Sequence, residues 1–118
     1  MSIKPFQLSM QEFILLIWQD DTLLSDEQQQ ARSQQLTRWI RDLSQQQLFV
    51  TAHTFWDYGY SVTGEANRPL RSITPISGNM QISGYMIVLA KDIKEAASLA
   101  KAYPGINFGA EVEVRELR

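Results

Sequence analysis

The stretch that most constrains the fold is residues 84–117, which reads GYMIVLAKDIKEAASLAKAYPGINFGAEVEVREL. An apolar run leads into an amphipathic helical pattern, a Pro-Gly pair ends that pattern, and an alternating strand follows. A strand-helix-strand unit can hardly be built from fewer residues. The stretch therefore predicts a helix between two strands at the C-terminal end of the chain.

The N-terminal half predicts a matching strand-helix-strand unit. Residues 11–18 (QEFILLIW) form a strand that is apolar on both faces, and such a strand belongs in the middle of a covered sheet. Ser25, with Gln28 three residues later, makes a capping box, so a helix is expected from there to about residue 46. Residues 48–56 (LFVTAHTFW) form the second strand, because they are rich in aromatic and β-branched residues.

The order of these elements predicts the fold class. Residues 82–91 form a third main strand that is again apolar on both faces, and Asp92 with Glu95 predicts a second capping box for the helix that follows. The order β-α-β-insertion-β-α-β is that of the ferredoxin-like split β-α-β fold, an α+β fold with an antiparallel sheet. The first and third main strands are expected in the centre of that sheet.

Two further segments complete the predicted organisation. Glycine and proline punctuate residues 57–81, which we interpret as a hairpin insertion with short strands at 58–63 and 70–74. Residues 1–10 lack a clear period and are interpreted as an N-terminal arm. One domain, residues 11–118, follows it.

The predicted sheet needs a cover on both faces. Two helices can cover only one face, and each large apolar side chain that is buried on the other is worth roughly 1.5–3 kcal/mol. If the second face of the sheet were exposed, its apolar patch would be larger than the patches that monomeric proteins usually expose. We therefore predict a homodimer packed through its sheet faces. The alternative is that the insertion and the N-terminal arm fold over that face within one chain.

Composition excludes several classes of function. The chain has 118 residues, is 44% hydrophobic and carries a formal net charge of −2, so nothing indicates a nucleic-acid partner. It has no cysteine and one histidine, so neither a metal nor a cofactor is expected. The longest early apolar run, residues 13–18, is too short for a signal peptide or a membrane span. We expect a cytoplasmic protein with no membrane partner.

Four segments form a recognisable pattern: the early EFILLIW, the Gly84-Tyr85 pair that opens a strand, the helix KEAASLAKAYP and the closing VEVREL. In their order and spacing they resemble the YCII-related family, in particular its DGPF-motif branch. The resemblance covers about residues 11–117 and implies a dimeric α/β barrel, with two ferredoxin-like sheets facing each other and a cleft in each subunit. The matching positions are Gly84, Tyr85, Ala96, Ala100, Pro104, Val112, Glu113, Val114 and Arg115.

The acid-base residues of the family have no counterpart in this chain. The resemblance implies a histidine on the first helix, paired with an aspartate, whereas this helix carries glutamines and Arg32. The Asp-Gly-Pro-Phe turn and its following glutamate are replaced by residues 72–81 (SITPISGNMQ), which contain no acidic residue. We therefore predict the fold of the family without its acid-base residues.

His53 is the candidate for any reassigned acid-base chemistry, because an unperturbed imidazole titrates near neutrality. Asp57 is its candidate partner, and the two form a catalytic dyad only if the strand bends, since four residues of straight strand span roughly 13 Å. The alternative is that His53 fills an aromatic-lined strand face.

Other residues are candidates for ligand binding. Aromatic side chains beside a glycine-punctuated loop suit either a pocket wall or a dimer interface. Glu113 and Arg115 share a strand face and either clamp an anion or form an ion pair across strands or subunits. Arg68 and Arg71 are expected to meet an anionic ligand at the cleft mouth. The full set of predicted ligand-binding residues is Arg32, Trp56, Tyr58, Tyr85, Glu113 and Arg115.

The sequence therefore predicts a homodimer that binds a small anionic or aromatic molecule in a cleft beside the sheet. One alternative is a small acid-base enzyme of the lyase or hydrolase type that uses His53. The other is a structural or regulatory dimer that serves another protein.

Overall fold

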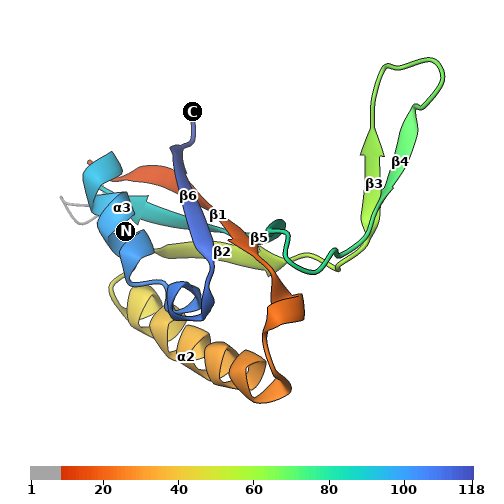
Figure 1. Ribbon diagram of the computed structural model, residues 1–118. Coiled ribbons are helices and arrows are strands. Elements are labelled where there is room, and N and C mark those ends of the chain that lie inside the picture. Colours follow the sequence, from red (N-terminus) through yellow and green to blue (C-terminus); the bar gives the residue numbers. More distant parts are fainter. Residues whose placement is uncertain (1–8) are drawn as a thin grey trace.

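The computed structural model describes residues 9–118, which adopt an α+β architecture with helices on one side of an antiparallel sheet (Figure 1). The strands of the main sheet are β1 (Gln11–Gln19), β2 (Phe49–Thr54), β5 (Gln81–Ala90) and β6 (Glu111–Glu116). Their order is β2-β5-β1-β6, and each neighbouring pair is antiparallel. The two central strands, β1 and β5, are the two that the sequence predicts to be apolar on both faces.

The long helix α2 (Asp26–Gln45) begins at the predicted capping box. The hydroxyl oxygen of Ser25 accepts a hydrogen bond from the N–H of Gln28, whose side chain accepts one from the N–H of Ser25. Four apolar side chains at helical spacing pack on the sheet, as predicted: Leu36, Trp39, Ile40 and Leu43. Within residues 9–118, no helix is both long and apolar enough to cross a membrane.

The second capping box is only half formed at the short helix α3 (Ile93–Lys101). The Asp92 carboxylate accepts from the N–H of Glu95 at 2.8 Å, as predicted. The Glu95 carboxylate, however, accepts from the N–H of Lys91 at 3.3 Å and not from that of Asp92. Pro104 then starts a 3₁₀ helix, η2 (Pro104–Phe108), that leads into β6.

Both helices cover the same face of the sheet. Phe13, Leu15 and Ile17 on β1 are 7% exposed or less, and they share their clusters with residues of the helices and with Tyr103 and Ala110, which flank η2. The alternating residues of β1 and β5 point to the other face and are only half-buried. We call this other surface the open face; its apolar residues are Ile14, Leu16, Trp18, Tyr85, Ile87 and Leu89.

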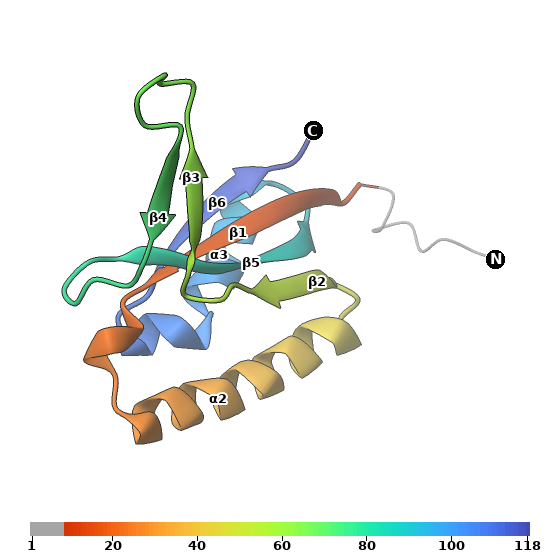
Figure 2. The ribbon, with the colours of Figure 1, turned by 90° about the vertical axis from the view of Figure 1, so that its right-hand side faces the viewer.

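The insertion forms a projecting hairpin. Within residues 9–118, β3 (Gly59–Val62) and β4 (Leu70–Ile73) pair only with each other, and we call residues 59–73 the arm. The arm stands away from the sheet on the side opposite α2 (Figures 1 and 2). The radius of gyration is 16.6 Å, whereas a compact chain of this length has about 13.5 Å.

The arm does not cover the open face of its own chain. Tyr60, Val62 and Leu70 on the arm are 69%, 72% and 59% exposed. In the single-chain alternative, the insertion and the N-terminal residues 1–10 together cover the open face. The part that concerns the insertion is wrong, because the hairpin extends outward instead of folding back. The part that concerns residues 1–10 falls largely on residues 1–8, which lie outside the described part of the chain.

Candidate ligand-binding groove

A groove of about 850 Å³ lies between the end of the sheet and the base of the arm. Three segments that are distant in the sequence form most of its walls, and Gln29 of α2 also lines it. The three segments are the end of β1 with the turn after it, the link from β2 to β3, and the segment from β4 to the start of β5. A volume of this size accommodates a small organic molecule.

Aromatic rings form one wall of the groove. Trp56 is 81% exposed and Tyr58 is 70% exposed, and both lie in the link between β2 and the arm. The ring of Phe55, in the same wall, lies 6.0 Å from that of Tyr85, measured between centroids. Rings with a polar edge and an apolar face suit stacking against a flat ligand. The predicted binding residues Trp56 and Tyr58 therefore come together with Asp57 on one wall.

Asp20 fixes another part of the groove lining in place. Its carboxylate is the acceptor for the hydroxyl and the N–H of Thr22, and also for the N–H of Gly78 at 2.6 Å. Gly78 lies between β4 and β5 and has a φ of +86°, a conformation that favours glycine. The hydrogen bond of the Thr22 hydroxyl, followed by those of the backbone N–H groups, lowers the pKa of Asp20 below its usual 3.8. Asp20 thus fastens the β4–β5 connection to the end of β1.

Replacing Asp20 by Asn is expected to weaken the fold at neutral pH and to change its response to acid. The lowered pKa of the folded carboxyl means that Asp20 stabilises the protein fully above its unfolded pKa. This contribution is lost as the pH falls through the lowered, folded-state value. Urea unfolding at pH values on both sides of 3.8 should therefore show a smaller acid-induced loss of stability in Asp20→Asn than in the wild type. Equal losses in the two proteins would contradict this role.

Arg32 lies behind the groove wall. Its guanidinium forms an ion pair with the Asp21 carboxylate, at 2.7 Å between Nη1 and Oδ1. Asp21 lines the groove and its side chain is 50% exposed, whereas that of Arg32 is 19% exposed and does not line the groove. Arg32 therefore positions Asp21, and its charge is already compensated.

Arg71 is the positively charged residue that lines the groove. It projects from β4, and among the described residues it forms no ion pair. The sequence predicts Arg68 and Arg71 at the cleft mouth, and the structure places only Arg71 there. Arg68 belongs to the exposed tip of the arm instead.

His53 lies on the open face, outside the groove. Its strand pairing places it in one row with Tyr85, Leu16 and Glu113 across the four strands. Its Nε2 atom shares a hydrogen bond with the Thr51 hydroxyl at 3.2 Å. The centroid of its ring lies 5.5 Å from that of the Tyr85 ring. His53 and Glu113 stand on opposite edge strands, three strand spacings or roughly 14 Å apart.

The structure does not join His53 to Asp57. The chain leaves β2 after Thr54, and Asp57 lines the groove, which His53 does not line. Within residues 9–118 no hydrogen bond or ion pair links the two side chains. The catalytic role of this dyad stays a prediction from the sequence.

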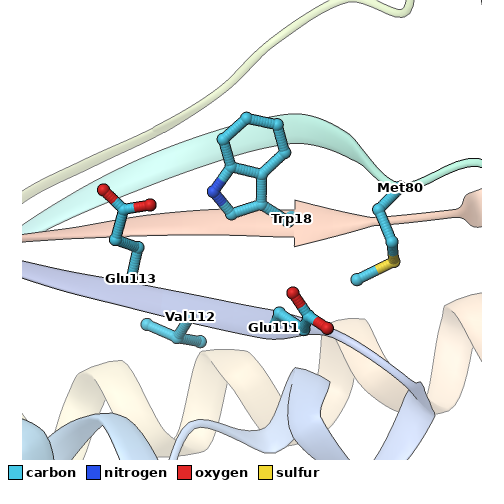
Figure 3. A pocket seen from close by; sticks show the side chains of 5 residues that line it. All are labelled: Trp18, Met80, Glu111, Val112 and Glu113. Atoms are coloured by element: carbon cyan, nitrogen blue, oxygen red, sulfur yellow. The ribbon is translucent and has the colours of Figure 1, made fainter.

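A second, smaller hollow of about 190 Å³ lies on the open face, beside β6. Trp18 and Met80 line it together with three residues of β6, Glu111, Val112 and Glu113 (Figure 3). Glu113 forms an ion pair with Arg115 at 2.6 Å, along one strand and not across strands. Tyr85, Glu113 and Arg115, which were predicted to bind ligand, thus lie on the open face and do not line the main groove, although Trp18 and Met80 line both the hollow and the groove.

The sequence predicts a turn at Asp20–Leu24, but Asp20 and Asp21, which that turn supplies to the groove, were not among the predicted site residues. One signal for them was present, because two successive aspartates directly follow a strand that is apolar on both faces. Polar residues at the end of a central strand often belong to a site, since such a strand lies inside the fold.

Comparison with known proteins does not assign this chain to a family. No family model matches the chain, and no curated protein sequence matches it. The resemblance to the YCII-related family therefore stays a prediction from the sequence. Among residues 9–118, no group of three or more acidic or histidine side chains is arranged to hold a metal ion.

Proposed function

We propose that this protein is a homodimer, paired through the open faces of its sheets, that binds a small anionic aromatic molecule in the groove. The observation that carries the proposal is the presence, on the walls of one groove, of the exposed aromatic rings of Trp56 and Tyr58 and of the cation of Arg71, which forms no ion pair within residues 9–118. A flat ring stacks on the aromatic wall, and the guanidinium binds the anionic group of the same molecule.

The dimer is supported by the open face. Ile14, Leu16 and Ile87 leave an apolar surface beside the arm that a monomer would expose to water. The strand order, with β1 and β5 in the centre, supports a ferredoxin-like fold for each subunit. A dimeric α/β barrel of the YCII-related type, without the DGPF chemistry and located in the cytoplasm, is part of the same proposal.

The fluorescent probe 1-anilinonaphthalene-8-sulfonate tests the groove, because it combines aromatic rings with one anionic group. Titration of the wild type should give saturable binding with enhanced emission. Trp56→Ala and Arg71→Gln should each weaken this binding by about tenfold, since each removes roughly 1.4 kcal/mol of stacking or ion pairing.

His53→Ala is the matched control, because His53 lies on the open face and not in the groove. If the probe binds in the groove, His53→Ala should bind it with the same affinity as the wild type. Probe binding that is unchanged in Trp56→Ala and Arg71→Gln, or lost in His53→Ala, would contradict the proposed site. Circular dichroism of each variant checks that it is folded.

A further inference from the structure

The two faces of the arm differ in character. In the register of β3 and β4, Tyr60 pairs with Ser72 and Val62 pairs with Leu70, so the side chains of these four residues share one face. The other face carries Arg71 and Ile73, which line the groove. A two-stranded ribbon is marginally stable in water unless something packs on it. The exposed apolar face of the arm therefore indicates a partner.

The arm and the strand β6 carry opposite charges. The arm has Arg68 and Arg71 against a single glutamate, Glu65, and none of the three forms an ion pair within residues 9–118. β6 has three glutamates against one arginine, in the sequence EVEVRE. Surfaces of opposite charge favour association in one orientation and disfavour others.

The hollow beside β6 has the chemistry to bind a guanidinium group. The indole of Trp18 lies between Glu113 and Met80, with Glu111 alongside (Figure 3). An aromatic face attracts a cation, and a carboxylate accepts its N–H groups. Glu111 has no ion-pair partner among the described residues, and the volume of about 190 Å³ suits the end of one side chain.

The arm stands on the side of the sheet opposite α2, which is the side of the open face (Figure 2). A second copy that covers the open face therefore lies beside the arm. Two-fold symmetry then gives each copy both an arm to offer and a β6 hollow to receive one.

We infer that the arm of each subunit clasps its partner, with Arg68 at the tip seated in the hollow formed by the partner's Trp18, Glu111 and Glu113. The inference rests on the proposed homodimer and assigns the arm as its second contact. The apolar face of the arm is then covered by the partner subunit.

Charge reversal tests the clasp. Sedimentation velocity over a dilution series should show that Arg68→Glu and Glu111→Arg each raise the dimer dissociation constant by about tenfold or more. The double variant restores the opposite charges and should recover most of the wild-type affinity. Arg38→Glu makes the same charge change on the exposed surface of α2 and should leave the dissociation constant unchanged.

The outcomes separate this inference from the proposed dimer. A wild-type dimer whose dissociation constant is unaffected by Arg68→Glu and Glu111→Arg would overturn the clasp and leave the sheet-face dimer standing. Two weakened single variants without recovery in the double variant would overturn the Arg68–Glu111 pairing. A wild type that is monomeric at all concentrations would overturn the dimer and the clasp together.

Discussion

Replacing Leu15 by Ala is expected to lower the free energy of unfolding by about 2–5 kcal/mol, which is a large fraction of the stability of a small domain. Leu15 lies in the central strand β1, is 0% exposed, and belongs to the cluster that joins the sheet to the helices. Truncation removes apolar contacts and leaves a cavity that the surrounding sheet fills only in part. Urea unfolding of the two proteins, followed by circular dichroism, measures the loss.

Leu16→Ala is the matched control, because the neighbouring leucine removes the same atoms from the other face of the same strand. Leu16 is half-buried in the single chain and lies on the open face. At protein concentrations that favour the monomer, Leu16→Ala should cost clearly less than Leu15→Ala. At high concentration its cost should grow, because the proposed dimer buries this face. Equal costs at low concentration would contradict the assignment of the two faces.

The layout of the main sheet could be predicted because its signals are local. Continuous apolar runs in β1 and β5 are typical of strands in the middle of a sheet, and the structure places these two strands at its centre, with one face buried and the other half-buried. The start of α2 could be predicted because Ser25 and Gln28 satisfy each other's hydrogen bonds within one turn.

The groove could not be predicted to the same extent, since its walls depend on contacts between distant segments. The bond between Asp20 and the N–H of Gly78 joins residues that are 58 positions apart. Neither residue type signals its partner, because aspartate and glycine are common in turns that make no such bond. Trp56 and Tyr58 could be predicted because aromatic residues cluster beside a glycine-punctuated loop, a pattern that suits a pocket wall.

The direction in which the arm projects could not be predicted from the sequence either. The turn residues between 57 and 81 predicted a hairpin, and the structure has its strands at Gly59–Val62 and Leu70–Ile73. Whether such a hairpin folds back or projects is decided by the few residues at its base. In this chain β2 ends at Thr54, two residues before the predicted end at Trp56, so the chain turns out of the sheet plane early.

Gly84→Ala is expected to destabilise the protein by about 1–3 kcal/mol or more, because the added methyl group has no space. A Cβ atom at Gly84 would lie 2.5 Å from the carbonyl oxygen of His53 and 3.2 Å from the Cα of Thr54. Both neighbours are backbone atoms of β2, so relief requires β2 to move away from β5. Chemical denaturation of wild type and variant measures the loss.

Gly64→Ala is the control for Gly84→Ala, since no atom of the described residues would lie within 4 Å of a Cβ atom at Gly64 on the arm. Its stability should stay within about 0.5 kcal/mol of the wild type. A shift of β2 at His53 and Thr54 also displaces the link that carries Trp56, so Gly84→Ala should weaken binding of 1-anilinonaphthalene-8-sulfonate under conditions in which the variant is still folded. A folded Gly84→Ala protein with wild-type affinity for the probe would show that the aromatic wall is positioned independently of the β2–β5 pairing. The groove would then depend on Asp20 and the arm alone, and not on the sheet.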